Sequence, residues 1–195
     1  MYNKKKDIRK DVYKKRNEIS AKQFENWNSL IFENVKCFIE EKKLSKIDTI
    51  FTYCNYNNEV STKELFKYMR EHGKTVAFPK ITDADKRKMS FFETNSYDEL
   101  VPGYKGIMEP VSNRNMDDYC ENAIMFIPMV AYDSNLNRVG YGGGYYDRYI
   151  EVNNPAIKIG LAFEFQKYEF QNDEFDKTMD YVITERAIYG GMTND

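Results

Sequence analysis

The sequence predicts an α/β protein with a mostly parallel sheet and helices on both of its faces. Short apolar segments that suit buried strands alternate along the chain with amphipathic segments of helical period. This alternation is typical of βαβ units, which form parallel sheets. The length of 195 residues suits one domain, and no repeat, low-complexity linker or composition change divides it. We therefore expect residues 1–195 to form a single domain.

The N-terminal part of the chain predicts two helices followed by a strand. Residues 3–17 predict a basic helix in which Ile8 and Val12 form a narrow apolar stripe. Ser20 to Gln23 form a capping box that begins a second helix, which extends to about residue 42. Residues 47–53 are typical of a strand.

The next segment predicts another helix and two more strands. Residues 61–64 predict a helix cap, and Gly73 marks the end of that helix. Strands are expected at 75–80 and 88–92, and the stretch 101–110 is predicted to be rich in loops. His72, the sole histidine, lies at the helix end and suits a surface position. Hydrolytic triads and histidine-ligated metals are therefore close to excluded.

The C-terminal half is organised around residues 137–148, a glycine-rich loop. The apolar run 123–130 predicts a buried strand before it, and a helix is expected to begin at Tyr145. Strands are expected at 158–163 and 180–184, separated by an acidic and aromatic segment. Strand, glycine loop and helix start thus follow one another directly.

Four of the ten glycines lie within five positions of this loop. Glycines permit positive φ, so the backbone N–H groups can turn toward a phosphate at the helix N-terminus. Arg138 and Arg148 add cations at either end. A flexible glycine turn is the alternative, but the pair Tyr145-Tyr146 is unusual in a linker. The loop matches neither the P-loop nor the dinucleotide fingerprint, which predicts a distinct kind of phosphate cradle.

Asp147 follows the cradle in the expected first helical turn. Its charge would repel a bound phosphate unless a cation lay between them, which suggests a bridging Mg²⁺. The alternative is an aspartate that stabilises the helix N-terminus with no ligand present.

Two further positions are candidates for ligand contact. Lys5 and Arg9 lie four residues apart on one face of the first helix, where they could reach an anion; the alternative is a solvated charged face. Glu59 follows the strand 47–53, at the position where open α/β sheets bind ligands. A solvated surface acid is the alternative for Glu59.

The composition excludes several classes of protein. Twenty-nine Lys and Arg against 31 Asp and Glu give a formal charge of −2, so no basic field favours nucleic acid. No apolar run reaches 18 residues and the N-terminus is charged, so we expect neither a membrane span nor a secretory signal. Three widely spaced cysteines suit a reducing compartment and neither a disulfide framework nor a zinc site. A cytoplasmic protein is expected.

Several separated motifs resemble one family, 5-formyltetrahydrofolate cyclo-ligase, also called methenyltetrahydrofolate synthetase. The likeness covers essentially the whole chain, and the glycine-tyrosine segment is its most specific part. The matching segments are Lys5 with Arg9, Tyr53 with residues 59–62, 78–80, 106–110, 137–147 and 179–185.

This resemblance implies a three-layer α/β/α sandwich and an ATP- and Mg²⁺-dependent reaction. The product is 5,10-methenyltetrahydrofolate, formed with release of ADP and phosphate through a phosphorylated formyl intermediate. The substrate is 5-formyltetrahydrofolate, polyglutamylated forms included, and a monomer is expected. Neither nucleic acid nor a membrane is an expected partner.

The family's functional residues are carried over position by position. Catalytic roles are implied for Arg138, Tyr145 and Asp147, and metal ligation for Asp147 and Asp180. Folate contacts are implied for Tyr53, Glu59 and Tyr145. ATP contacts are implied for Lys5, Arg9, Arg138, Val139, Gly140, Tyr141, Gly142, Gly143, Gly144, Tyr145 and Tyr146.

Two positions depart from the family pattern. Lys105 stands where many relatives have an aromatic residue, and Phe175-Asp176 replaces a His-Asp pair. Two other functions stay open at this point: another ATP-dependent small-molecule kinase or ligase on this scaffold, and a non-catalytic folate- or nucleotide-binding regulator. Intact Asp147 and Asp180 count against the regulator, because binding alone seldom needs a metal that aligns phosphates.

Overall fold

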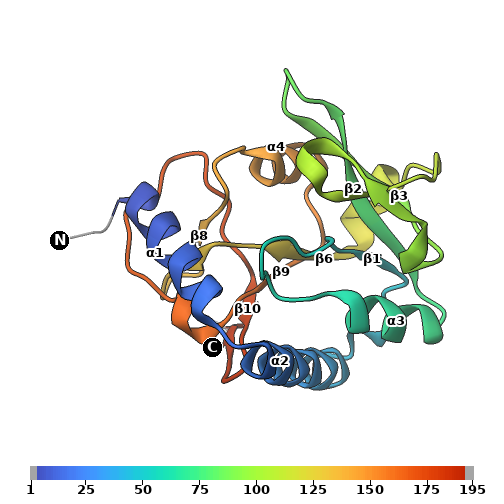
Figure 1. Cartoon of the computed structure of the whole chain (residues 1–195). Coiled ribbons are helices and arrows are strands. Elements are labelled where there is room, and N and C mark those ends of the chain that lie inside the picture. The colour runs from blue at the N-terminus through green and yellow to red at the C-terminus, as the bar shows by residue number, and fades with distance from the viewer. Residues whose placement is uncertain (1–3, 192–195) are drawn as a thin grey trace.

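The structure is a computed structural model that describes residues 4–191, so the expected helix start at Asn3 lies outside the described residues (Figure 1). Within that range, seven strands form the main sheet in the order β11-β10-β9-β6-β1-β2-β3. Their bounds are β1 (Thr49–Phe51), β2 (Thr75–Asp83), β3 (Lys88–Glu93), β6 (Ala123–Pro128), β9 (Ile157–Leu161), β10 (Tyr181–Ile183) and β11 (Ile188–Gly190).

The five inner strands are parallel, and the two edge strands are antiparallel. β1 pairs in parallel with both β2 and β6, and the parallel ladder continues through β9 to β10. β3 and β11 pair antiparallel at the two edges. The expectation of a mostly parallel sheet is confirmed.

Helices cover both faces of the sheet, as the alternation of elements predicts. α2 (Ala21–Glu41) and α3 (Lys63–Glu71) pack one face into a core cluster that includes Val35, Phe66 and Ile124. α4 (Tyr145–Asn153) and the 3₁₀ helix η4 (Asp117–Asn122) pack the other face, where Tyr149 meets Met125 in a second cluster. In Figure 1, α2 and α3 lie below the sheet and α4 above it. The architecture is an α/β/α sandwich.

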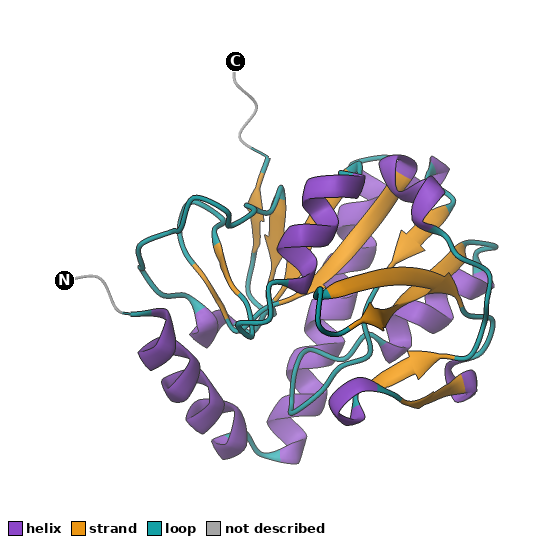
Figure 2. Cartoon of the chain, turned by 90° about the horizontal axis from the view of Figure 1, so that it is seen from above, coloured by secondary structure: helices purple, strands orange, loops and turns teal. Residues whose placement is uncertain are grey.

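α1 (Lys5–Glu18) stands to one side of the sandwich, as Figures 1 and 2 both show. It packs on a third and smaller apolar cluster, which we call the α1 cluster. Lys15 Nζ of α1 also donates a hydrogen bond to the Tyr168 hydroxyl at 2.6 Å. The α1 cluster consists of Ile8, Val12, Val130, Ala131, Val139 and Phe170.

Two local expectations concern helix caps. The capping box before α2 is confirmed, with Gln23 N–H donating to Ser20 Oγ at 3.3 Å. α3 begins at Lys63 as expected, but within the described chain the Thr62 side chain makes no cap bond. Thr62 has φ −104° and ψ 8° instead of extended geometry, and its hydroxyl donates to the Tyr53 carbonyl.

Several short elements were not predicted. The stretch expected to be loop-rich contains the paired strands β4 (Leu100–Pro102) and β5 (Met108–Pro110). β7 (Ala131–Tyr132) pairs with β8 (Arg138–Val139), which lies at the start of the segment 137–148. Strands of two or three residues are too short for an alternating pattern to be visible unless a longer apolar segment surrounds them, as at β1 and β10. Other short helices are η1 (Leu44–Lys46), η2 (Tyr97–Glu99), η3 (Tyr104–Gly106) and η5 (Glu164–Gln166).

Within residues 4–191, none of the helices combines the length and the apolar character that crossing a membrane requires.

Candidate active site

A cavity of about 570 Å³ lies at the carboxyl ends of β1 and β6. Tyr53 and Cys54 follow β1, and Pro128 ends β6; all three line the cavity. The strand order reverses between these two strands, which is the usual ligand position in an open parallel sheet. The volume suits a drug-sized or cofactor-sized ligand.

The glycine loop forms one wall of this cavity and leads directly into α4. Gly144, the N-cap residue of α4, has φ +69°, and Gly142 has φ +93°. A Cβ at Gly143 would lie 2.8 Å from the ring of Tyr145, so a side chain there would displace the ring. Because no side chain caps α4 within the described residues, the first N–H groups of the helix are open to a ligand.

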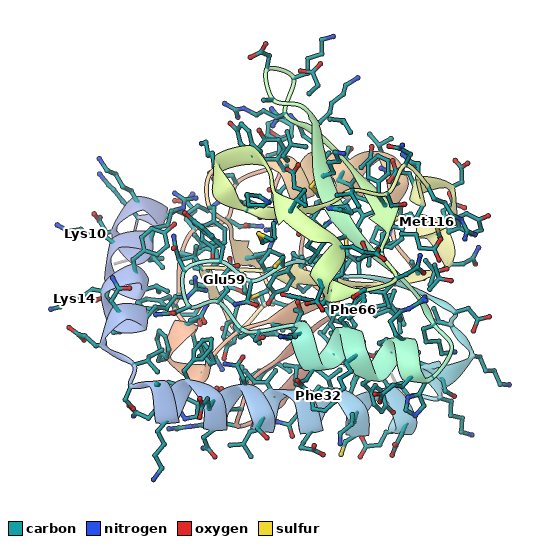
Figure 3. The ribbon with its side chains drawn as sticks, turned by 45° about the vertical axis from the view of Figure 1, so that its right-hand side comes forward. Lys10, Lys14, Phe32, Glu59, Phe66 and Met116 are labelled. Atoms are coloured by element: carbon teal, nitrogen blue, oxygen red, sulfur yellow. The ribbon has the colours of Figure 1, made fainter. Side chains whose placement is uncertain are left out.

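α1 contributes cations to the same wall. Arg9 Nε donates to the Gly140 carbonyl at 2.7 Å, and Lys5 Nζ lies 2.6 Å from the carboxylate of Asp173. Both side chains line the cavity. Lys10 and Lys14 instead point outward from the opposite side of α1 (Figure 3). The helix therefore has one face toward the cavity and one solvated charged face.

Arg138 and Asp147 form a partly buried ion pair beside the cradle. Arg138 Nη2 lies 2.6 Å from Asp147 Oδ1, and the guanidinium lies over the ring of Tyr146, 5.7 Å from its centroid. Asp147 keeps part of its surface open and lines the cavity. A neighbouring guanidinium thus already balances some of the carboxylate charge.

Asp180 does not join Asp147, and the predicted pairing of these two carboxylates on one metal is not found among the described residues. Asp180 Oδ2 accepts the backbone N–H of Lys158 at 2.7 Å and lies 3.0 Å from the Lys158 ammonium. Asp180 immediately precedes β10 and Lys158 lies near the start of β9. In a parallel sheet these starts lie at the edge opposite the carboxyl ends, so Asp180 is outside the cavity lining.

The acidic groups fit a Mg²⁺ ion that arrives with phosphates better than a site made by the protein alone. Residues 4–191 contain no group of three or more His, Cys, Asp or Glu arranged to hold a metal. Mg²⁺ commonly takes one or two carboxylates and completes its shell with water and substrate phosphates. Asp147, open to the cavity next to the cradle, supplies one such carboxylate.

Glu59 also lines the cavity and is not a surface acid. It is 5% exposed, and Figure 3 shows it between α1 and the sheet. Its Oε2 accepts the backbone N–H of Tyr56 at 2.7 Å. Burial raises the pKa of this carboxyl, and hydrogen bonds from Tyr141 and Tyr56 partly offset the rise. Tyr53, buried beside it, donates its hydroxyl to the Val60 carbonyl at 3.0 Å.

Aromatic residues frame the cavity near the start of α4. The rings of Tyr104 and Tyr145 meet edge to face with centroids 6.2 Å apart. Lys105 also lines the cavity, with its ammonium 5.3 Å from the centroid of the Tyr104 ring. Phe175 is 79% exposed, although its neighbours Asp173 and Asp176 line the cavity. Both departures from the family pattern therefore lie at or beside this site.

The structure brings most of the sequence-predicted site residues into one cavity. Val139 is an exception, because its side chain packs into the α1 cluster below the loop. The predicted residues that line the cavity are Lys5, Arg9, Tyr53, Glu59, Arg138, Gly140, Tyr141, Gly142, Gly143, Gly144, Tyr145, Tyr146 and Asp147.

The sequence analysis missed other residues of this region. Glu109 Oε1 accepts the N–H groups of Ile81 and Tyr104, each at 3.2 Å, and fixes the loop at the cavity edge to β2. Asp173 and Asp176 contact Lys5 across the cavity wall. Arg16 is buried behind Tyr141. A glutamate within an otherwise apolar segment, as at Glu109, is the one sequence signal that was visible.

Comparisons with known proteins agree on one family. The model of the 5-formyltetrahydrofolate cyclo-ligase family matches residues 1–185. A protein from Haemophilus influenzae called 5-formyltetrahydrofolate cyclo-ligase is 30% identical over 169 residues, covering 85% of this chain and 89% of the relative. One of the same name from Mycoplasma genitalium is 29% identical and covers 92% and 96%. The solved structure of Aquifex aeolicus 5,10-methenyltetrahydrofolate synthetase superposes with a TM-score of 0.83 at 26% identity, covering 98% of this chain and 94% of that one.

Proposed function

Because the chain belongs to the 5-formyltetrahydrofolate cyclo-ligase family and is an enzyme of that family, we propose that it closes the ring of 5-formyltetrahydrofolate with ATP and Mg²⁺. The products are 5,10-methenyltetrahydrofolate, ADP and phosphate. The observation that carries the proposal is that one cavity is lined both by a glycine loop with the cations Lys5, Arg9 and Arg138 and by a buried carboxylate, Glu59.

The triphosphate binds along the glycine loop. Backbone N–H groups at the start of α4 and the cations of Lys5, Arg9 and Arg138 are suited to anionic oxygens. Lys5 exchanges its contacts with Asp173 and Asp176 for phosphate oxygens when the nucleotide enters.

The pteridine binds at the side of Glu59. A carboxylate can accept two N–H bonds from one planar heterocycle, and such charge-assisted bonds are stronger than neutral ones. Tyr53 and Tyr145 also line the cavity, and we assign Tyr145 contacts with both ligands.

The reaction requires activation because a formamide oxygen is a poor leaving group. In the first step the formyl oxygen attacks the γ-phosphorus and ADP leaves, which gives an iminium phosphate. N10 then attacks the formyl carbon, the N10 proton is lost, and phosphate departs with the former formyl oxygen. The cavity residues contribute alignment and charge neutralisation, the two demands of phosphoryl transfer.

Mg²⁺, when it is bound with the triphosphate, neutralises charge on the phosphate oxygens. Asp147 is the residue placed to hold it, and Arg138 holds Asp147 in position through their ion pair. Arg138 also faces the cavity, where its guanidinium can stabilise the charge that develops on the transferred group. No histidine takes part in this scheme.

We propose that a single chain is catalytically complete, since residues of one chain line the whole cavity. The substrate is a soluble small molecule and the location is the cytoplasm. Gel filtration combined with activity across a range of protein concentrations tests this part; activity that depends on dimer formation would contradict it.

Ultraviolet absorbance at the methenyl product's band tests the proposed reaction. The band should grow when 5-formyltetrahydrofolate, ATP and Mg²⁺ are all present, and one ADP should form per product. Product growth without ATP, or ATP hydrolysis without product, would contradict the proposal. The second result would favour another ATP-dependent kinase or ligase.

A further inference from the structure

Arg16 is a fully buried charge for which the proposed reaction assigns no role. It lies in the last turn of α1, and its side chain is 2% exposed. Nη1 donates to the Tyr141 hydroxyl at 2.6 Å and Nη2 donates to the Met129 carbonyl at 2.7 Å. Nε finds no partner among the described residues. A buried guanidinium with an unsatisfied nitrogen costs stability, so its retention calls for a reason.

The contact between Arg16 and Tyr141 determines which hydrogen bonds the Tyr141 hydroxyl accepts and which it can donate. A guanidinium can only donate hydrogen bonds, so the Tyr141 oxygen must accept from Arg16. The Tyr141 proton is then free to point toward the Glu59 carboxyl, whose pKa the Tyr141 hydroxyl lowers. Tyr141 is thus a bridge with Arg16 on one side and the cavity carboxylate on the other.

Tyr141 is held by contacts to its ring and by a contact to its hydroxyl. Its ring is 40% exposed and lines the cavity between two glycines of the cradle. The ring stacks on Tyr13 of α1, with centroids 6.2 Å apart and planes 18° from parallel. α1 therefore fixes both the ring and the hydroxyl of Tyr141.

We propose that Arg16 is a positioning residue that, through Tyr141, keeps Glu59 charged and aimed at the pteridine of the substrate. The substrate part of this inference rests on the proposed function. The same arrangement joins the phosphate cradle to the pteridine end, because Tyr141 belongs to the cradle and lines the cavity together with Glu59.

The surroundings of Glu59 make this support necessary. Burial raises the pKa of Glu59. The Tyr141 hydroxyl opposes this rise in pKa most, followed by the Tyr56 N–H and then by the positive charge of Arg16. The other titratable groups that face Glu59 are neutral at pH 7 and favour its protonation if they ionise. They come from α1, the segment after β1 and the start of α4: Tyr13, Tyr53, Cys54 and Tyr146.

A purely structural role for Arg16 is the competing explanation. In that case Arg16 would serve only to fasten α1 to the Met129 carbonyl. Its replacement would lower stability but would leave the titration of Glu59 unchanged in any variant that folds. The two roles are therefore separable by a measurement on Glu59 itself.

NMR titration of the glutamate carboxyl carbons in the ligand-free, full-length protein provides that measurement. Glu59→Gln identifies the Glu59 signal by its loss. Tyr141→Phe, whose ring is open to the cavity and whose packing changes little, should raise the pKa of Glu59 by about one to two units. Arg16→Met should also raise it, whereas Lys14→Met, on the solvated face of α1, should not. An unchanged Glu59 pKa in Tyr141→Phe overturns the proposal whether or not Arg16→Met folds.

Folate binding by the same variants connects the chain of contacts to the substrate. Tyr141→Phe should weaken 5-formyltetrahydrofolate binding about tenfold at pH 7. In a Glu59→Gln background the same change should have no further effect. If Tyr141→Phe weakened folate binding equally in the wild-type protein and in Glu59→Gln, the proposal would be overturned. A raised Glu59 pKa without loss of affinity would overturn it too, and would place the fault in the assignment of Glu59 to folate.

Discussion

The two walls of the cavity differ in charge and in how they are held. We call the side proposed for the pteridine the pteridine wall; it includes Glu59, a buried carboxylate in the segment that follows β1. We call the side proposed for the triphosphate the phosphate wall; it includes Lys5, Arg9 and Arg138, and much of it belongs to α1 and the glycine loop. The pteridine wall is continuous with the main core. The phosphate wall is formed largely by α1, which packs beside the sandwich.

The two walls also differ in the apolar packing that supports them. The segment before Glu59 runs from β1, which contributes Ile50 and Phe51 to the two large core clusters. α1 rests on the small α1 cluster and on polar contacts such as that between Lys15 and Tyr168. A carboxylate held by the core gives a fixed recognition point, while a layer with fewer apolar contacts opens more readily. We infer that the phosphate wall is the part that adjusts when ligands enter.

The largest expected effect separates the two candidate metal ligands. Asp147→Asn should lower kcat by about 10²–10³, because it removes the cavity carboxylate next to the proposed triphosphate and leaves Arg138 unbalanced. Raised Mg²⁺ should restore part of the rate. Asp180→Asn is the matched control: its carboxylate contacts Lys158 at the opposite strand edge, so kcat should stay within about twofold of wild type. Steady-state kinetics at limiting and saturating Mg²⁺ checks both, and equal losses would restore Asp180 to the metal site.

Glu59→Gln is expected to change the pteridine wall alone. Replacing a charged acceptor by an amide should raise the KM for 5-formyltetrahydrofolate about ten- to hundredfold, with the KM for ATP unchanged. Because burial raises the pKa of Glu59 above the ordinary value of 4.5, wild-type folate affinity should fall as the pH drops through that raised pKa. In Glu59→Gln this acidic limb of the pH profile, the fall in folate affinity at low pH, should be absent. A pH profile of kcat/KM for folate checks this, and a retained limb would assign it to another group.

On the phosphate wall, Arg9→Met should raise the KM for ATP about tenfold, since one charge-assisted contact is lost. Lys10→Met is the matched control, because Lys10 lies one residue along the same helix and points outward. These point changes are sharper than deletion of residues 1–10, which would also remove Ile8 from the α1 cluster. Equal KM values for ATP in both variants would make α1 a solvated helix with no part in binding.

The smallest effect concerns stability. Ile8→Val and Ile31→Val remove the same methyl group from buried positions in the α1 cluster and in the large cluster that contains α2. Each should lower the free energy of unfolding by about 1 kcal/mol. Hydrogen exchange should separate them, with faster exchange confined to α1 in Ile8→Val and spread over the sheet in Ile31→Val. The same exchange pattern in both would mean that the two regions unfold together.

The sequence predicts long elements well and short ones poorly. The apolar run at β6 and the capping box before α2 are local patterns, and the structure agrees with both. β11 and the β4–β5 pair depend on tertiary pairing and have strands of three residues each. β1 and β10 also have three residues each, but the longer apolar segments around them were visible in the sequence.

For the site, the glycine loop could be recognised because its residue types are needed by the backbone itself. Arg16 could not, since within a helix of many basic residues only the packing decides which one is buried. Asp180 shows the converse error. It was assigned by resemblance, but the strand direction places it at the edge away from the cavity.

Calorimetric titration of three proteins with two ligands tests the separation of the walls most directly. Wild type, Glu59→Gln and Arg9→Met would each be titrated separately with 5-formyltetrahydrofolate and with a nonhydrolysable ATP analogue in Mg²⁺. The account predicts a crossed result: Glu59→Gln loses folate affinity and keeps nucleotide affinity, and Arg9→Met does the reverse. If either variant loses equal affinity for both ligands, the two ligands do not bind to separate walls of the cavity.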